Sequence, residues 1–173
     1  MCKKALMIAI TLVFVLSMSE LVLAANTSIK LDYGTGNTIL HNQLGDKNFA
    51  YTYVKGNSNS ATIDQTGEYN RAQQTQNGQT PLTADIKQTG DRNNATQNQK
   101  GYSHEATITQ TGYSNIASQT QSGGLPDKNK ADIIQTGSKN IAHQIQSHSG
   151  NTATITQDGS NNFAKQSQIN AYR

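Results

Sequence analysis

The sequence predicts an all-β protein: a β-solenoid with cross-β, amyloid-like stacking of about five to six strand-turn-strand rungs. Three features favour this fold. Units of about 22 residues recur in tandem, which is typical of solenoids whose units stack on one another. Within each unit, apolar and amide residues alternate with a period of two, as they do in strands. Each half-unit ends near a glycine, the residue that most easily adopts the positive φ of a tight turn.

Residues 1–24 have the anatomy of a secretory signal peptide. Lys3 and Lys4 precede an apolar run over residues 5–18, and Val22-Leu23-Ala24 forms a small-residue cleavage site. We expect cleavage after Ala24. A membrane anchor is the alternative, but the run is shorter than the roughly 20 residues of a membrane-spanning helix. Cys2 is the only cysteine and would leave with this segment, which excludes disulfides and cysteine-based metal sites from the rest.

Residues 25–37 match no repeat, and we expect a flexible N-terminal leader there, followed by the repeat solenoid over residues 38–173. Removal of residues 1–24 takes away Lys3, Lys4 and Glu20 and leaves a net charge of +2. This charge is too small and scattered to favour nucleic acid as a partner. The composition, rich in Gln and Asn, is alone compatible with disorder and β-aggregation. The regular spacing favours an ordered solenoid instead.

The first glutamine of each unit defines the repeat, with intervals of 22, 23, 22, 25 and 22 residues. The series is Gln43, Gln65, Gln88, Gln110, Gln135 and Gln157. A glycine follows two residues later in every unit, and we expect each to form a turn: Gly45, Gly67, Gly90, Gly112, Gly137 and Gly159.

The alternation predicts which side chains point between two facing strands. The first half of a unit has the pattern Ala-x-Ile-x-Gln and the second half Asn-x-Ala-x-Gln-x-Gln, with the residues between them directed to water. Gln74, Gln97, Gln119, Gln144 and Gln166 are therefore expected to point inward. The inward amides that we expect to form the ladders, besides the six glutamines above, are Asn48, Asn70, Gln76, Asn93, Gln99, Asn115, Gln121, Asn140, Gln146, Asn162 and Gln168.

Stacking explains why the amides repeat while their neighbours vary. Equivalent residues of stacked rungs lie about 4.8 Å apart, the spacing between strands. At this spacing an amide N–H reaches the carbonyl of the next rung, and identical amides form a ladder. A buried amide that lacks its partner costs about 1–3 kcal/mol, so every rung must keep the same residue. We therefore expect these positions to carry stacking and polymerisation.

Exceptions fall where a solenoid tolerates them. Pro81 and Pro126 lie between units, where no strand needs their missing N–H. The first unit has Thr52 and Val54 in place of its last two glutamines, which predicts a degenerate rung at the N-terminal end.

The motif Gln-x-Gly-x-x-Asn-x-Ala-x-x-x-Gln in tandem resembles the curlin repeat, and five units fit it at every position. Curlins are the subunits of curli, the extracellular amyloid fibres of bacteria. The resemblance implies passage through the periplasm, export by an outer-membrane curli export machinery, and surface assembly with itself and the other curlin subunit for adhesion and biofilm formation. The segment "ATIDQTGEYN" is similar to the minor, nucleating curlin, which we favour over the major one.

Other functions find less support. The histidines His41, His104, His143 and His148 occupy unrelated positions, where we expect exposed or turn histidines and neither a metal site nor catalysis. No cofactor or small-molecule substrate is indicated. An ice-binding or glycan-binding solenoid is the alternative, although Asp64 and Lys87 interrupt the threonine array that ice binding needs. Four apolar residues lie between Asn and Ala of their units: Phe49, Ile116, Ile141 and Phe163. We expect them to pack around the turn corner; the alternative is an exposed apolar stripe.

Overall fold

The computed structural model describes residues 25–78, 81–123 and 128–169, and these residues form strands joined by short arcs. Within those ranges, no helix is long and apolar enough to cross a membrane. The strands are β1 (Thr27–Tyr33), β2 (Thr38–Leu44), β3 (Phe49–Gly56), β4 (Ser60–Thr66), β5 (Arg71–Gly78), β6 (Thr83–Asp91), β7 (Asn94–Gly101), β8 (Glu105–Tyr113), β9 (Ile116–Gly123), β10 (Lys130–Ser138), β11 (Ile141–Ser147), β12 (Thr152–Ser160) and β13 (Phe163–Ile169).

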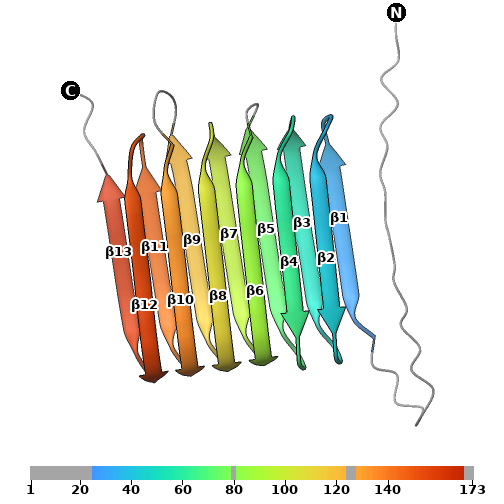
Figure 1. The fold of residues 1–173 in the computed structure, drawn as a ribbon, viewed down its shortest axis with the longest axis vertical. Helices are drawn as coiled ribbons and strands as arrows, with labels where there is room; N and C mark the ends of the chain where they lie inside the picture. The colour runs from blue at the N-terminus through green and yellow to red at the C-terminus, as the bar shows by residue number, and fades with distance from the viewer. Residues whose placement is uncertain (1–24, 79–80, 124–127, 170–173) are drawn as a thin grey trace, which may run out of the picture.

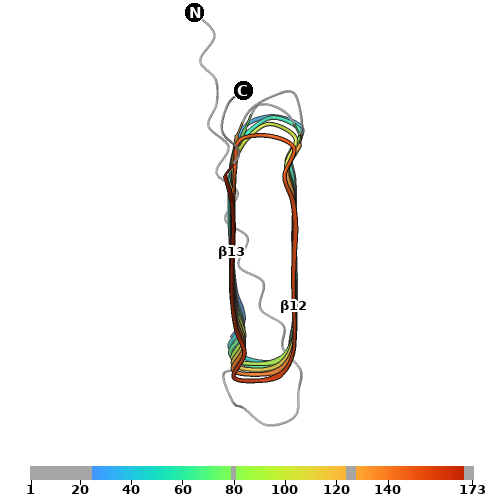
Figure 2. The same cartoon turned by 90° about the vertical axis from the view of Figure 1, so that its left-hand side faces the viewer.

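Consecutive strands alternate between two parallel sheets. The odd-numbered strands form a seven-stranded sheet in the order β1 to β13, and the even-numbered strands form a six-stranded sheet in the order β2 to β12 (Figure 1). The chain thus winds as a flat coil whose turns superimpose in the end-on view (Figure 2). Each even strand and the odd strand after it make one rung. Six rungs, from β2–β3 to β12–β13, confirm the predicted all-β solenoid.

The register aligns equivalent residues of every rung. Ile108 of β8, for example, pairs with Ile86 of β6 and Ile133 of β10. Inward alanines and isoleucines from both sheets form the core, and the amides lie between them. Because alanine is small, the two sheets approach closely and exclude water from the amides. The buried residues of the strands from β4 to β12 confirm the predicted inward faces of these strands.

The expectation of a flexible leader over residues 25–37 is wrong for Thr27–Tyr33. This segment forms β1 and pairs in parallel with Phe49–Lys55 of β3. The arc before β1 is held in the same way as later arcs. The backbone N–H of Asn48 donates to Asn26 Oδ1 at 2.9 Å, and Asn26 Nδ2 donates to the carbonyl of Gly45 at 2.8 Å. Asn26 therefore begins the asparagine series one rung earlier than the sequence pattern suggested.

The turn glycines are required by conformation and by space. All six predicted turn glycines have positive φ, and that of Gly90 is 99°. A Cβ on Gly90 would lie 2.2 Å from the carbonyl oxygen of Gly112 in the next rung, far inside contact distance. Pro81 lies in the arc between β5 and β6, as predicted, while Pro126 lies outside the described residues.

Candidate functional site: amide ladders and open sheet edges

Three glutamine ladders run through the solenoid. In the ladder on the even sheet, Gln65 Nε2 donates to Gln88 Oε1 at 2.8 Å and Gln88 Nε2 donates to Gln110 Oε1 at 2.9 Å. The same bond joins every adjacent pair from Gln43 to Gln157. Two further ladders on the odd sheet contain Gln74, Gln97, Gln119, Gln144 and Gln166, and Gln76, Gln99, Gln121, Gln146 and Gln168.

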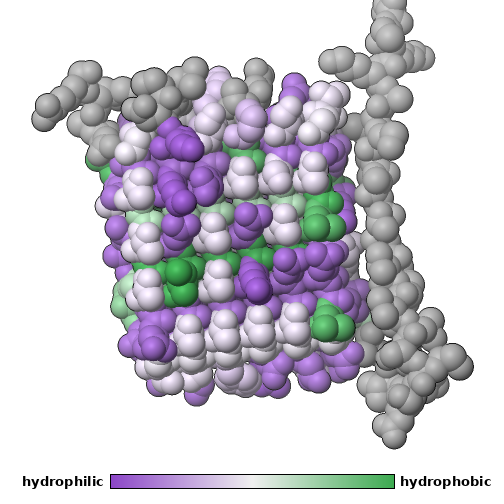
Figure 3. Space-filling view, viewed as in Figure 1, coloured by the Kyte–Doolittle hydropathy of each residue, from purple (hydrophilic) through white to green (hydrophobic). Residues whose placement is uncertain are grey.

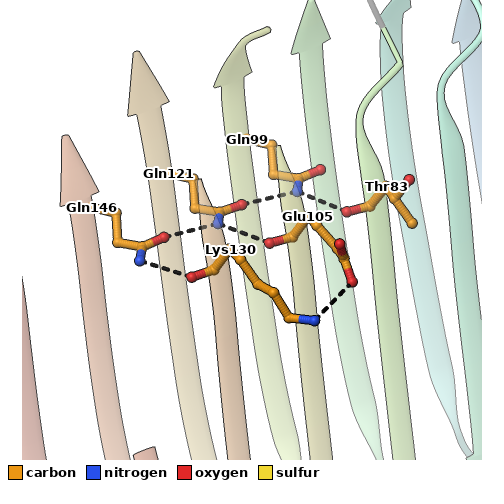
Figure 4. A network of polar contacts seen from close by, with 6 residues as sticks. All are labelled: Thr83, Gln99, Glu105, Gln121, Lys130 and Gln146. Atoms are coloured by element: carbon orange, nitrogen blue, oxygen red, sulfur yellow. Dashed lines mark hydrogen bonds and ion pairs between the residues drawn. The ribbon is translucent and has the colours of Figure 1, made fainter. Parts of the chain in front are cut away.

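A second hydrogen bond fixes the direction of these amides. Gln99 Nε2 also donates to the carbonyl of Thr83 at 2.7 Å, and Gln121 Nε2 donates to that of Glu105 at 2.8 Å (Figure 4). A backbone carbonyl only accepts, so the nitrogen must face it and the oxygen must face the preceding rung. Each ladder is therefore polar: its N–H groups point toward the C-terminal rungs and its carbonyls toward the N-terminal rungs.

Burial makes the ladders intolerant of exceptions. Gln110 and Gln135 are both fully buried. An unsatisfied amide group at such a site costs about 1–3 kcal/mol, against about 1 kcal/mol net for a bond that is made. The benefit thus depends on the next rung offering the same side chain.

The asparagines form part of the predicted side-chain ladder, since Asn93 Nδ2 donates to Asn70 Oδ1 at 3.2 Å and Asn115 Nδ2 donates to Asn93 Oδ1 at 3.1 Å, but most of their bonds go to the backbone. Asn70 Nδ2 donates to the carbonyl of Gly90 at 2.6 Å, and Asn70 Oδ1 accepts the backbone N–H of Asn93 at 3.0 Å. Asparagine therefore clamps the backbone of one arc to the arc of the next rung. The clamp to the next asparagine N–H recurs along Asn48, Asn70, Asn93, Asn115, Asn140 and Asn162.

A second clamp series, which was not predicted from the sequence, lies in the opposite arcs. The backbone N–H of Asn59 donates to Asn37 Oδ1 at 2.8 Å, and that of Asn151 donates to Asn129 Oδ1 at 2.9 Å. This series has the same intervals as the glutamines, which was the signal that could have revealed it. The positions of the series are Asn37, Asn59, Leu82, His104, Asn129 and Asn151. Because Leu82 and His104 replace asparagine at two of them, the repeat is not evident in the sequence.

The glutamine ladders of the odd sheet end at β3. Thr52 Oγ1 donates to Gln74 Oε1 at 3.3 Å, which continues one ladder through a hydroxyl. Val54 offers no donor, and the buried Gln76 Oε1 beneath it has no hydrogen-bond partner among the described residues. These two positions confirm the degenerate first unit, but β1 stacks beyond it.

His41 terminates the ladder that passes through Thr52. Its Nε2 lies 2.7 Å from Thr52 Oγ1, and its Nδ1 lies 2.8 Å from Ser28 Oγ. Burial, together with the Lys30 ammonium, lowers the pKa of His41 to about 4. His104 is only 2% exposed, and burial likewise lowers its pKa. The expectation of exposed or turn histidines is therefore wrong for His41, which lies on the inner face of β2, and holds for His104, which lies in an arc although it is buried.

The outer face of the even sheet carries threonine rows with charged interruptions. Figure 3 shows this face as rows of intermediate hydropathy that hydrophilic and apolar side chains interrupt. One row is continuous over four strands: Thr66, Thr89, Thr111 and Thr136. In the neighbouring rows, Asp85 pairs with Thr107, and Lys87 with Asp64 and Thr109. These charges break the flat threonine array that an ice-binding face requires. Among the described residues, no group of three or more His, Cys, Asp or Glu is placed to hold a metal.

The proposed apolar stripe is not continuous, and corner packing is wrong for two of its members. Ile116 and Phe163 are 41% and 67% exposed on the outer face of the odd sheet. Arg71 and Asn94 occupy the equivalent positions of β5 and β7 and separate Phe49 from Ile116.

Comparison with known families agrees with this geometry. Residues 34–67, 82–112 and 127–159, together more than half of the chain, match the family model of the curlin associated repeat. The chain belongs to the curlin family. Each matched range contains two of the six Gln-x-Gly pairs, so the curlin repeats coincide with the rungs of the solenoid. No curated protein and no solved structure matches the chain.

Curlin repeats make this chain a curli subunit, a structural protein of an extracellular fibre that polymerises with itself. The amide ladders are what the repeat contributes to such a role. At the C-terminal end of the described solenoid they reach β12 and β13, each of which has a neighbour on one side only. At the other end only the ladder of the even sheet reaches an edge strand, β2, because the ladders of the odd sheet end one strand before β1.

Proposed function

We propose that the chain is secreted after cleavage at Ala24, crosses the periplasm, leaves through the outer-membrane curli export machinery, and polymerises on the cell surface by stacking rung upon rung. The fibre serves adhesion and biofilm formation. The partners are further copies of this chain and the other curlin subunit. The polymerisation residues are the glutamines of the ladders and the asparagines of the arc clamps.

The observation that carries this proposal is the continuity of the ladders up to an open edge. The last rung keeps Gln157 in register with Gln135, and Gln168 in register with Gln146. Its strands offer the next subunit the same inward pattern and the same backbone groups that each internal rung offers its neighbour. An unpaired strand edge of this kind is a ready surface for pairing with another chain.

Of the two curlin roles, we propose the minor, nucleating one. The similarity of "ATIDQTGEYN" to the repeats of that subunit and the basic character of the chain, with a sequence pI of about 9.0, support it. A nucleator needs an edge that binds incoming subunits, and the complete ladder positions of β12 and β13 suit that task.

Purified protein lacking residues 1–24 tests polymerisation. We expect unaided growth of thioflavin-binding fibres with a cross-β reflection at about 4.7–4.8 Å. Protein that stays soluble for days at micromolar concentration would contradict the proposal. Thermal hysteresis or glycan binding by that soluble protein would then favour one of the alternatives.

Gene deletion with complementation separates the two roles. If the chain is the nucleator, its deletion should leave the major subunit secreted but unpolymerised. If the chain is the major subunit, its deletion should remove both the fibres and the secreted fibre subunit.

A further inference from the structure

Tyrosine is the side chain of residues 25–173 that a one-electron oxidant attacks most easily. The sequence has no tryptophan, and its one cysteine and three methionines all lie in residues 1–24. The sulphur and indole groups that otherwise compete for an oxidant are therefore missing from the rest of the chain. All seven tyrosines lie in that part. A radical formed there settles on a phenol, and its fate depends on what surrounds each phenol ring.

Two of these rings lie in contact at the N-terminal end of the odd sheet, where β1 lies beside β3 (Figure 1). Tyr33 of β1 and Tyr53 of β3 have ring centroids 5.4 Å apart and planes tilted by 40°. The parallel register pairs Tyr53 with Leu31, so Tyr33 is its diagonal neighbour on the outer face. Tyr33 is 37% exposed, and Tyr53 is half-buried. An oxidant in solution thus reaches one ring, and the second ring is already in contact with it.

Tyr69 and Tyr113 provide a comparison within the same molecule, because an arginine lies between them. Arg92 belongs to the intervening rung, and its guanidinium lies 5.7 Å from the ring centroid of Tyr69 and 5.6 Å from that of Tyr113. Its Nη1 also donates to the Tyr113 hydroxyl at 2.7 Å. A cation held over both rings keeps their carbon atoms apart. Among the described residues, Tyr33 and Tyr53 therefore form the only tyrosine pair with a direct ring contact.

We propose that Tyr33 and Tyr53 form an oxidative cross-link site, at which a dityrosine bond fastens the edge strand β1 to β3. The oxidant is of the peroxidase class, which uses hydrogen peroxide to withdraw single electrons. Each phenol loses one electron and one proton and becomes a phenoxyl radical. The two radicals join through the ring carbons next to their hydroxyl groups, and each of these carbons passes its hydrogen to the phenol oxygen of its own ring. The two electrons and two protons reduce one hydrogen peroxide to two waters.

The cross-link acts on the strand of the odd sheet that the glutamine ladders do not reach. The inward positions of β1 carry Ser28, Lys30 and Asp32. The strand is held by backbone pairing and by the Asn26 clamp. A covalent bond across the strand pair restricts the detached states of β1, as a disulfide restricts an unfolded chain. The modified chain therefore keeps its first strand paired under conditions that release it from the unmodified chain.

Peroxidase treatment of the purified chain tests the site. The chain is treated at low concentration with one equivalent of hydrogen peroxide, then denatured and digested with trypsin. Cleavage after Lys30, Lys47 and Lys55 places Tyr33 and Tyr53 on separate peptides. We expect these peptides to be joined, with a mass lower by two hydrogen atoms than their sum and with dityrosine fluorescence. Because the rings are already in contact, this pair should be roughly tenfold more abundant than any other tyrosine pair.

Conservative variants identify the ring that reacts. The second peptide also contains Tyr51, which lies on the outer face two residues before Tyr53 and pairs with Ile29. Tyr53→Phe should remove the cross-link, whereas Tyr51→Phe and Tyr69→Phe should retain it at the wild-type yield. Each variant loses only a hydroxyl group, so the strands still pair. In a mixture of isotopically labelled and unlabelled chains, the joined peptides should be wholly labelled or wholly unlabelled, because both rings belong to one chain.

Amide hydrogen exchange measures the effect of the bond on the edge strand. In the cross-linked chain, the amides of Thr27–Tyr33 should exchange roughly tenfold more slowly than in the untreated chain, because detachment of β1 is the opening that exposes them. Treated Tyr53→Phe should exchange like the untreated protein.

The same reaction in concentrated guanidinium is the control for the folded arrangement, and there the preference for this pair should disappear. A preference that persists in denaturant, joined peptides that combine the two labels, or a yield no higher than that of other tyrosine pairs would overturn the proposal. Unchanged exchange of Thr27–Tyr33 in the cross-linked chain would overturn the fastening of β1. Both measurements concern the single chain, so a failure to polymerise leaves them valid and bears on the proposed function alone.

Discussion

At the scale of the residue, side-chain length decides how each amide is used. Glutamine is long enough to reach the carbonyl of the facing strand while still meeting the glutamine of the next rung, as Gln110 does with Asn94 and Gln135. Asparagine is one methylene shorter and binds the backbone of the neighbouring arc instead, as Asn115 does with Gly137. Both roles require strict repetition, but glutamines connect side chain to side chain in every rung, whereas asparagines do so only between Asn70, Asn93 and Asn115.

Substitution of one ladder residue tests this division. Gln110→Ala removes the acceptor of one N–H of Gln88 and the donor to Gln135 Oε1, and it leaves this N–H and this oxygen buried without partners, although Gln88 Nε2 keeps its bond to the carbonyl of Arg71. At about 1–3 kcal/mol for each group, fibres should dissociate at clearly lower guanidinium concentration and grow more slowly. The midpoint of dissociation and the thioflavin growth rate measure this.

Thr109→Ala is the matched control, because Thr109 is adjacent in sequence and points outward. We expect its effect to stay within about 0.5 kcal/mol, as is usual for surface substitutions. Equal effects from the two substitutions would show that the inward and outward faces are wrongly assigned.

The period of two was sufficient to predict which residues point inward, since one strand conformation serves every rung. It does not predict which partner a polar side chain selects. Asn140 and Gln146 share the same repeat regularity, yet Asn140 binds the backbone of the neighbouring arcs and Gln146 binds the glutamine of the next rung, and only three-dimensional reach separates the two. His104 was unpredictable for a related reason: it fills an asparagine position in an arc, and burial there depends on the arcs above and below.

At the scale of the element, β1 shows that strand pairing extends beyond the segment that carries the repeat motif. Its inward residues Ser28, Lys30 and Asp32 share nothing with Ala-x-Gln-x-Gln, so sequence repetition could not reveal it. The strand forms because parallel pairing depends on backbone groups and on the Asn26 clamp. Polar side chains are tolerated there because the edge is only partly buried.

The stability of the edge strands β1 and β2 should depend on pH through His41. Its pKa is about 4 in the folded chain, against an ordinary value of 6.5. Between these values the unfolded segment binds more protons than the folded one. The free energy of unfolding of β1 and β2 is therefore greatest above pH 6.5 and declines as the pH falls toward 4. Amide hydrogen exchange in Thr27–Leu44, compared at about pH 7 and about pH 4.5, should show the loss of protection.

His41→Ile introduces isoleucine, the residue type found at the equivalent position of the next rung, Ile63. The variant should lose the pH dependence of exchange in β1 and β2. Because the pKa of His104 is also lowered, the measurement must resolve single residues, and only the effect at the first two strands is assigned to His41. An unchanged pH profile in His41→Ile would contradict this assignment.

At the scale of the whole molecule, the two ends of the solenoid are unequal. At the C-terminal end, β12 and β13 keep the ladder glutamines in register with the preceding rung. At the other end, β1 places Ser28, Lys30 and Asp32 at the inward positions of the odd sheet. The C-terminal edge should therefore accept an incoming strand of the repeat pattern better than the N-terminal edge, and fibres should grow mainly from one end.

Lys30→Gln tests this asymmetry by placing a ladder amide at the N-terminal edge, in register with Thr52 of β3. One additional hydrogen bond to an incoming strand contributes about 1 kcal/mol, so growth from the slower end of single fibres, followed by microscopy, should become roughly fivefold faster. Work at about pH 7.5 keeps His41 neutral in both proteins. Lys55→Gln, an identical change at an exposed position of β3, is the control and should leave both ends unchanged. If Lys30→Gln also leaves the slower end unchanged, the inward residues of β1 do not limit growth there; if only Lys30→Gln speeds it, the missing amide of β1 is what makes the two ends unequal.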